Sequence, residues 1–451
     1  MQQFIFRMWS TSISYKQILK QAVPISFSLL VPQISFFANA AFLGRVGEHE
    51  MVINGLASIF YLLLNWVGYG LSSGIMVVLS RRIGEQRRDA LNPTLYNGLL
   101  LSAVTCVSLM ALSYMGMDLL YSYALDNTFL KDGIVSFLHI KVLGLPFLMF
   151  TQLFNALFIA LGRSRLLIWG ALTSNLTIVC LDYGLIFGNF GLPALGVQGA
   201  AWASLAGEVV LALTTFLIYR WRGLHREFPV LSDAGKDKQI IRNIIKVSTP
   251  LVLQYIFSIG GWQLFFIYVE HLGTSEVAIS HVLRSILGIV SVGTWALAST
   301  CNTLVSRQIG AGQEKEVYGT ILRLITVSIG YTAIISAILL LFPRQVLSIY
   351  TDSSYLVSLG MTITPILALS TLVMSISTVC FNAVVGTGNT WINFSIESST
   401  VILYCVFITY VIGYLRMPID ISWTSEIFYW TLLLAASGGY LLSGKWKGKT
   451  V

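Results

Sequence analysis

Charged residues are scarce in this chain of 451 residues. They make up 11% of the sequence, whereas hydrophobic residues make up 55%. A soluble globular domain usually carries about 25% charged residues. So much apolar side chain exceeds what one water-soluble core of this size can bury, which excludes a soluble globular protein. Lipid must therefore be the solvent for most of these side chains.

Motifs that carry catalysis or nucleotide binding are also missing. The sequence contains no P-loop, no HExxH pattern and no ATP-binding domain. The five cysteines lie in apolar runs without CxxC spacing, so we expect neither a disulfide framework nor a metal site. We therefore expect no enzyme and no cofactor. Energy for any transport then comes from an ion gradient or from the gradient of the substrate.

Long apolar runs recur along the chain. A bilayer core about 30 Å thick needs about 20 helical residues to cross it. The runs are continuous rather than alternating, which favours helices over barrel strands. A polar stretch near 222–246 separates two sets of six runs. The expected spans lie near 17–44, 51–79, 95–122, 133–161, 166–188, 197–219, 248–271, 277–305, 319–342, 355–386, 391–414 and 424–444.

Lysine and arginine residues are distributed unevenly between the loops. If both termini are cytoplasmic, 22 of the 28 fall in cytoplasmic segments, four fall on the opposite side, and Lys141 and Arg284 fall inside spans. Cytoplasmic loops of membrane proteins carry an excess of basic residues. The bias predicts a multi-pass plasma-membrane protein, in the inner membrane if the source is bacterial, with both termini cytoplasmic. It also accounts for the net charge of +8 without a nucleic-acid partner.

The two halves of the chain repeat each other with an offset of 226 residues. SRRIG at 80–84 recurs as SRQIG at 306–310, and in the same register Gly162 meets Gly388. One ungapped register over about 140 residues indicates two copies of a six-span unit. Because six is an even number, both copies have the same orientation. Their pseudo-twofold axis is then expected along the membrane normal.

We therefore expect an all-α integral membrane protein with twelve transmembrane helices in two six-helix bundles. The bundles cover residues 1–221 and 247–451, and residues 222–246 form a cytoplasmic linker with an amphipathic helix at KQIIRNIIK. Two bundles joined in this way suit a transporter that alternates access to a central site. The chain is expected to act as a monomer in the lipid bilayer.

Ionisable groups at the depth of the lipid are the candidate functional residues. One charge at a helix centre costs roughly 2.5–3.5 kcal/mol, so such a group usually faces a cavity or a partner. Asp182 either pairs with Lys141 or loads and releases a cation or proton, because low-dielectric surroundings favour the neutral carboxyl. Glu208 and Glu397 either bind a cationic substrate or hydrogen-bond a neighbouring helix. Arg284 needs an acidic or carbonyl partner.

Several stretches resemble the multidrug and toxic compound extrusion (MATE) transporters. The longest, LDYGLIFGNFGLPALGVQGAAWASLAGE at 181–208, resembles their hairpin of spans five and six. Shorter likenesses are FFANAAFLGRVG (36–47), NALFIALGRSR (155–165), TLVSRQIGAGQ (303–313) and FNAVVGTGNT (381–390). The resemblance covers nearly the whole chain. It implies an antiporter that exports organic cations or other amphiphilic small molecules in exchange for H⁺ or Na⁺.

The resemblance also implies residues for the coupling ion. The family's acid on span five matches Asp182, whereas the acid often found on span one is Asn39 here. The usual amide one turn before the span-five acid is Ile178, with Asn175 a turn earlier, and a small hydroxyl on span six matches Ser204. A Na⁺ site prefers several oxygen ligands, often charged ones. The missing carboxylate and amide favour protonation of Asp182 over a Na⁺ site near it.

The expected substrate site draws on both copies of the repeat. Asn155 matches a polar family residue on span four, and Gln33 lies beside Pro32 in a first span that can kink. Some relatives carry an acid on span seven, where this chain has Gln263. The full set is Asn155, Gln33, Glu208, Glu397, Gln263 and Arg284.

A flippase for a lipid-linked precursor or another lipid-like substrate is the alternative. Such a protein would often have a more basic cavity and sometimes extra spans. Twelve spans with only two basic residues inside them favour the exporter. A passive channel is a third class, but it usually needs a ring of subunits or a pore filter, which a duplicated two-bundle chain does not suggest.

Overall fold

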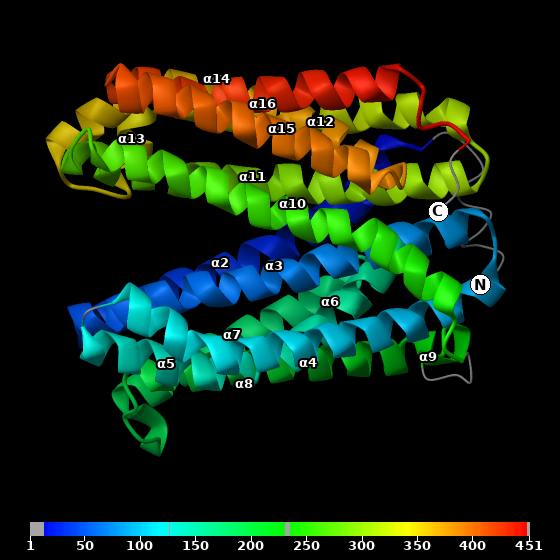
Figure 1. Cartoon of the computed structure of the whole chain (residues 1–451), viewed down its shortest axis with the longest axis horizontal. Helices are drawn as coiled ribbons and strands as arrows, with labels where there is room; N and C mark the ends of the chain where they lie inside the picture. The colour runs from blue at the N-terminus through cyan, green and yellow to red at the C-terminus, as the bar shows by residue number, and fades with distance from the viewer. Residues whose placement is uncertain (1–12, 126, 231–234, 449–451) are drawn as a thin grey trace. The chain divides into compact units, whose positions relative to one another are not determined.

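The computed structural model describes residues 13–125, 127–230 and 235–448, and every regular element in these ranges is helical. The cytoplasmic chain ends and part of the linker that the sequence predicts fall outside these ranges. The helices of the first half are α2 (Tyr15–Val46), α3 (Glu48–Gly84), α4 (Leu91–Ala124), α5 (Thr128–Val142), α6 (Leu145–Ala160), α7 (Arg165–Phe187) and α8 (Val197–Trp221) (Figure 1).

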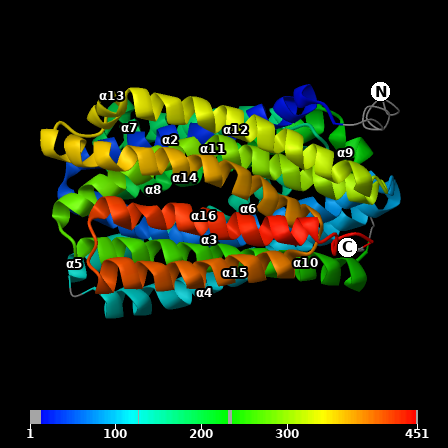
Figure 2. The same cartoon turned by 90° about the horizontal axis from the view of Figure 1, so that it is seen from above.

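The second half follows after the short helix α9 (Leu224–Glu227). Its helices are α10 (Lys238–Glu270), α11 (Thr274–Gly310), α12 (Val317–Leu341), α13 (Pro343–Ser348), α14 (Ser354–Gly386), α15 (Thr390–Ile408), which continues as a π-helical turn over Thr409–Tyr414, and α16 (Ile419–Leu442). In the C-terminal part of the chain α14 packs along α11, α12 and α16, and both views show α14 and α16 side by side (Figures 1 and 2).

The twelve predicted spans appear in order. Ten helices of the described chain are long and apolar enough to cross a membrane, and the pair α5–α6 makes an eleventh span. The twelfth, α16, has 24 residues, enough at 1.5 Å per residue to cross the hydrocarbon core. It carries Asp420, Glu426 and several Ser, Tyr and Trp residues among its apolar ones.

The fourth predicted span, 133–161, is not one straight helix. It is divided into α5 and α6, which are bent by 48° at Leu143–Gly144. Pro146 lies in the first turn of α6. It has no backbone N–H, so it cannot continue the helical hydrogen bonds of α5. Asn127 caps the start of α5 by accepting backbone hydrogen bonds from Phe129 and Leu130. The span therefore starts earlier than predicted and carries a break.

The amphipathic helix expected in the linker is not a separate element. KQIIRNIIK forms the first turns of α10, and the helix then continues through Pro250 to Glu270. Asp237 Oδ1 caps this helix by accepting hydrogen bonds of 2.8 and 3.2 Å from the backbone N–H groups of Gln239 and Ile240. Ile244 and Val247 are buried in the protein rather than laid on a membrane surface. With no glycine between Lys238 and Thr249, nothing in the sequence ends the helix there.

The chain divides into two compact units, which we call the N-terminal and C-terminal units. The N-terminal unit comprises Phe27–Ile83 and Arg87–Val252, and the C-terminal unit comprises Met1–Ser26, Gly84–Gln86 and Leu253–Val451. These bounds differ from the expected bundles because α2 and α10 each belong to both units. The start of α2 joins the C-terminal unit because its buried Ile and Ala side chains pack into a core with α11, α12 and α14.

Small residues bring α7 and α8 into close contact. Gly199 of α8 lies against the backbone of Leu185, and Gly207 lies against the side chain of Ile178. A Cβ atom at either glycine would collide with α7. Small residues allow the same close approach in many membrane helix pairs. This packing sets the positions of the acidic side chains on both helices.

The repeated pentapeptides end equivalent helices, as the sequence predicts. α3 ends at Gly84 and α11 ends at Gly310. Two residues later the backbone is left-handed in both copies, at Gln86 with φ 59° and at Gly312 with φ 72°. Within the C-terminal unit, Gly84 lies so close to the carbonyl of Arg307 that a Cβ atom would not fit.

Candidate functional site

Asp182 lies at the centre of the polar site in the N-terminal unit. Its side chain is completely buried on α7. Asn39 Nδ2 of α2 donates a hydrogen bond of 3.1 Å to Asp182 Oδ2. The other carboxyl oxygen, Oδ1, is buried and has no hydrogen-bond partner among the described residues. The structure thus brings Asn39 and Asp182 together, two of the residues that the family resemblance implied for the coupling ion.

Asn175 lies on the same face of α7 two turns before Asp182, but it contacts a different residue. Its Nδ2 donates to the carbonyl of Ala171 at 2.7 Å, and its Oδ1 accepts from Ser35 Oγ of α2 at 2.5 Å. Ser35 and Asn39 are one turn apart on α2. The two contacts lie one turn apart along α2, and both join α2 to α7. Asn175 therefore helps to hold Asn39 beside Asp182.

A second polar cluster lies at the break between α5 and α6. Lys141 Nζ, near the end of α5, donates a hydrogen bond to Ser204 Oγ of α8 and lies 4.8 Å from the centre of the Tyr61 ring. The Tyr61 hydroxyl lies 2.9 and 2.8 Å from the two carboxyl oxygens of Glu208, to which it donates. The Glu208 carboxyl lies against Gly144 at the N-terminus of α6. A helix N-terminus favours a negative charge.

Lys141 connects the two clusters. Its ammonium group interacts electrostatically with Glu208 and, more weakly, with Asp182. Of the two interpretations of Asp182, direct pairing with Lys141 is not what the geometry shows: Asn39 is the hydrogen-bonding partner, and Lys141 contacts Ser204 instead. Tyr61 was not anticipated from the sequence, because a tyrosine in an apolar run carries no pattern that marks it as polar-facing.

Glu397 is the buried acid of a corresponding cluster in the C-terminal unit. Its side chain is 2% exposed on α15. Its Oε1 accepts hydrogen bonds from Ser258 of α10 and, at 2.7 Å, from Tyr429 of α16, while Oε2 is buried without a partner among the described residues. One turn away Asn393 Nδ2 donates to Gln254 Oε1 at 2.5 Å. Polar side chains therefore join α10 to α15 over two turns.

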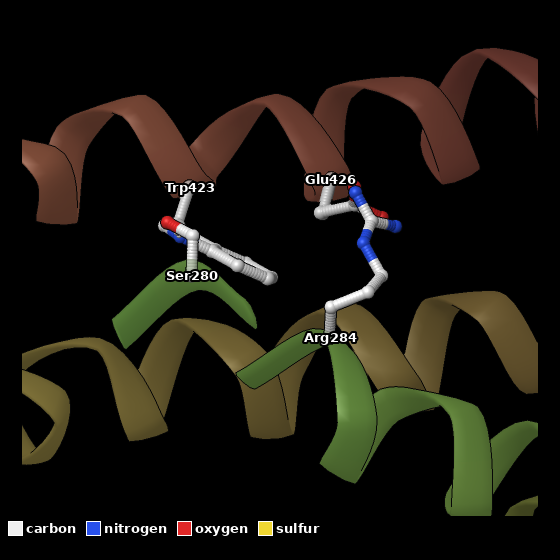
Figure 3. A network of polar contacts seen from close by, with 4 residues as sticks. All are labelled: Ser280, Arg284, Trp423 and Glu426. Carbon is white, nitrogen blue, oxygen red and sulfur yellow. Dashed lines mark hydrogen bonds and ion pairs between the residues drawn. The ribbon is translucent and has the colours of Figure 1, made fainter. Parts of the chain in front are cut away.

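Arg284 of α11 has the acidic partner that the sequence predicted it would need. Its Nη2 lies 3.4 Å from Oε1 of Glu426 on α16 (Figure 3). Its guanidinium carbon lies 3.7 Å from the centre of the Trp262 ring, and Trp423 faces it at 5.7 Å. Trp423 in turn donates a 3.1 Å hydrogen bond from Nε1 to Ser280 (Figure 3). Sequence reasoning did not single out Glu426, although an arginine at lipid depth implied such an acid.

The remaining predicted residues stay outside these clusters. Gln33 of α2 and Asn155 of α6 are half-buried in the N-terminal unit, and Gln263 of α10 is exposed in the C-terminal unit. The expected substrate residues therefore divide evenly, with Gln33, Asn155 and Glu208 in one unit and Glu397, Gln263 and Arg284 in the other.

A protein-family model described as MatE matches the chain twice, over residues 24–183 and 250–415. The two matches begin 226 residues apart, which is the offset of the internal repeat, and together they cover more than half of the chain. The chain belongs to the MatE family. This is a family of membrane transporters, so the resemblance noted in the sequence is confirmed.

Curated relatives of this MatE-family chain share its length as well as its pattern. A Thermotoga maritima protein named probable multidrug resistance protein NorM is 25% identical over 448 residues, which are 97% of this chain and 94% of the relative. A Synechocystis sp. protein of the same name is 21% identical over 340 residues, which are 75% of this chain and 73% of the relative.

Solved structures share the fold. One, described as the outward-facing conformation of a multidrug resistance MATE family transporter of the MOP superfamily, matches with a TM-score of 0.87 at 18% identity and covers 96% of this chain and 97% of its own. A MOP superfamily transporter from Pyrococcus furiosus Vc1, described as having a binding pocket of reverse polarity, matches with a TM-score of 0.85 at 17% identity over 95% of both chains. These likenesses confirm the twelve-helix, two-bundle fold.

Proposed function

We propose that this MatE-family chain is a secondary active antiporter that exports organic cations or other amphiphilic compounds in exchange for H⁺, with Na⁺ as the alternative coupling ion. One observation carries the proposal. Asp182 is completely buried, is held by one amide hydrogen bond, and keeps Oδ1 free of hydrogen-bond partners among the described residues. A buried carboxyl without an ion pair at contact distance is stable when it binds a monovalent cation, and a proton needs only one oxygen.

The atoms around Asp182 favour a proton over Na⁺. A Na⁺ ion needs several oxygen ligands. The group that contacts the Asp182 carboxyl is an N–H donor of Asn39, which cannot ligate a cation. The amide oxygen of Asn175 accepts the Ser35 hydroxyl and is not directed to Asp182. We therefore assign proton uptake to Asp182, with Asn39, Asn175 and Ser204 positioning the residues of the site.

The substrate class rests on the relatives and on the buried acids. The two relatives described above are named multidrug resistance proteins. Glu397 keeps one buried carboxyl oxygen without a partner among the described residues, so it could pair with a cationic group. We assign substrate contacts to Glu208, Gln33 and Asn155 of the N-terminal unit and to Glu397, Gln263 and Arg284 of the C-terminal unit. The transporter is proposed to act as a monomer in the plasma membrane with both termini cytoplasmic.

The test uses the purified full chain in proteoliposomes loaded with a cationic dye. An imposed pH gradient without Na⁺ should drive dye movement by the natural protein, and Asp182→Asn should abolish this movement while the protein remains monodisperse. Asp118→Asn, which neutralises an exposed carboxyl on α4, is the matched control and should behave like the natural protein.

Three results would change the proposal. Normal efflux by Asp182→Asn would remove Asp182 from coupling. Strict dependence on Na⁺ would reverse the choice of ion. Transbilayer movement of a fluorescent lipid, with no movement of dye, would support the lipid-flippase alternative.

A further inference from the structure

We propose that Lys141 is a tethered cation that sets the charge of the site around Asp182, so that the site exchanges one proton and excludes Na⁺. The inference rests on the proposed antiport and names the residue that determines its ion specificity. Its basis is the contact of the Lys141 ammonium group with the Ser204 hydroxyl and the Tyr61 ring, beside the Glu208 carboxyl of α8 to which Tyr61 donates. The same ammonium group interacts electrostatically with the buried Asp182 carboxyl of α7.

The charges of the site balance to a single negative unit. With both carboxyl groups ionised, Asp182 and Glu208 contribute two negative charges and Lys141 contributes one positive charge. Tyr61 of α3 and Cys106 of α4 add no charge while their hydroxyl and thiol groups are protonated. A low-dielectric interior makes any net charge costly, so the cluster reaches neutrality by taking up one monovalent cation. One proton on Asp182 satisfies this requirement.

The Lys141 ammonium group also contacts two groups that could otherwise face an inorganic cation. Its Nζ donates to Ser204 Oγ, and it faces the Tyr61 ring at 4.8 Å. A hydroxyl oxygen and the face of an aromatic ring are both favourable neighbours for a cation. A covalently attached ammonium competes for these neighbours without the loss of translational freedom that a free Na⁺ ion suffers.

The break in span four places Lys141 in this position. Lys141 lies in the last turn of α5, and the chain bends by 48° before α6 begins at Leu145. The carbonyl end of α5 favours the ammonium, and the N-terminus of α6 favours the Glu208 carboxylate beside Gly144. The two helix ends thus stabilise opposite charges at one point of the membrane-spanning bundle.

The internal repeat shows that the fold does not require this lysine. At the offset of 226 residues, Lys141 corresponds to Leu367 of α14, which is completely buried in an apolar core. The basic residue of the C-terminal unit, Arg284, corresponds to Ser58 in the first copy. Each unit therefore has its half-buried cation at a different position of the repeat. A leucine is compatible with the helical environment of the fourth span, which makes Lys141→Leu a suitable test variant.

The experiment compares five proteins: the natural chain, Lys141→Arg, Lys141→Leu, Glu208→Gln and the double variant Lys141→Leu with Glu208→Gln. The first measurement is dye efflux from proteoliposomes driven by a pH gradient or by a Na⁺ gradient. The second is titration of the purified proteins with NaCl, followed by the apparent unfolding temperature. Size-exclusion chromatography confirms that each protein is folded.

The net charge of each variant predicts its behaviour. The natural chain and Lys141→Arg keep a charge of one negative unit, so both should show proton-driven efflux and no stabilisation by Na⁺. Lys141→Leu has two negative charges and should gain Na⁺-driven efflux and Na⁺ stabilisation, while its proton-driven rate falls about tenfold. In Glu208→Gln the charges of Asp182 and Lys141 sum to zero, so the site no longer needs a further cation. Proton-driven efflux should therefore fall about tenfold, and Na⁺ should not increase it.

The double variant is the decisive protein. It restores one net negative charge on Asp182 alone, and its proton-driven efflux should recover toward that of the natural chain. A double variant that is folded but no better than either single variant would overturn the proposal, as would Lys141→Leu without any response to Na⁺. If the proposed antiport itself is wrong, the natural chain will move no dye under a pH gradient. The Na⁺ titration of Lys141→Leu against the natural chain then still tests the role of Lys141.

Discussion

The guanidinium group of Arg284 is held between an aromatic ring and a carboxylate: it lies 3.7 Å from the centre of the Trp262 ring, and its Nη2 lies 3.4 Å from Glu426 Oε1. A cation over a tryptophan face is attracted to the ring, and the attraction is stronger away from water. The carboxylate compensates the charge that the ring cannot neutralise. This contact joins α11 to α16 inside the C-terminal unit. Without these partners, the charge of Arg284 would be costly in the surrounding lipid.

Removing only the cation of this pair should destabilise the protein. Arg284→Met leaves the Glu426 carboxylate buried without a cation, and breaking a buried pair in this way typically costs about 3–5 kcal/mol. We expect a clear fall in the apparent unfolding temperature in detergent. The double variant Arg284→Met with Glu426→Gln should lose less, and Arg344→Met, at an exposed arginine of α13, should change little. A single variant as stable as the double would contradict this account.

Gly144 at the break in span four should not tolerate a methyl group. Its backbone angles, φ −76° and ψ −21°, suit alanine, but a Cβ atom there would collide with the Glu208 carboxyl. Gly144→Ala should therefore displace Glu208 and lower both efflux and the unfolding temperature. Gly116→Ala is the matched control, because a Cβ atom on α4 at that position meets no neighbour within 4 Å. Replacing glycine by alanine in a helix usually stabilises by about 0.5–1 kcal/mol. Equal effects of the two changes would disprove the role of the contact.

The hydroxyl groups around Glu397 should be coupled to its carboxyl. Tyr429→Phe removes a 2.7 Å hydrogen bond to Oε1, and Ser258→Ala removes the other donor to the same atom. Each change should lower stability by about 1–3 kcal/mol, because a buried acceptor is left with fewer donors. In a Glu397→Leu background the same changes should have little effect, as a double-mutant cycle of unfolding temperatures would show. Additive losses would mean that the hydroxyl groups act elsewhere.

The loops after α3 and α11 should respond in opposite ways to a change between glycine and a residue with a side chain. Gln86 adopts the left-handed backbone that Gly312 adopts in the second copy. A left-handed conformation costs a residue with a side chain roughly 1–2 kcal/mol, and glycine avoids most of this cost. Gln86→Gly should therefore raise the unfolding temperature, while Gly312→Ala should lower it. If both changes move the temperature in the same direction, the left-handed strain does not explain the glycine.

Much of the architecture could be predicted because it depends on properties of short segments. A run of 20 or so apolar residues predicts a span wherever it occurs, and the 226-residue register predicts the duplicated unit without knowledge of any contact. Asp182 could be found in the same way, because a carboxyl inside an apolar run is unusual. Its partner Asn39 came only from the family resemblance, and the structure places the two in contact.

The partners of the other charges could not be predicted, because each contact joins residues far apart in the chain. Lys141 meets Ser204 across 63 positions, and Tyr61 meets Glu208 across 147. Which polar residues meet depends on how each helix is rotated about its axis, and apolar runs that face lipid on one side give a weak indication of that rotation. The pairing of Arg284 with Glu426 rather than with Glu397 is a result of the same kind.

Hydrophobic length, the balance of basic residues and the repeat are properties along the chain, and they determined by themselves that this protein is a duplicated set of membrane helices with a few buried charges. Only the tertiary structure decided that the fourth span breaks at Gly144, that α10 begins inside the expected linker, and that Lys141 contacts Ser204 and Tyr61. The physical reason is that the membrane stabilises any apolar helix of sufficient length. A buried charge, by contrast, is stable only beside a particular partner, and the packing between helices must supply that partner.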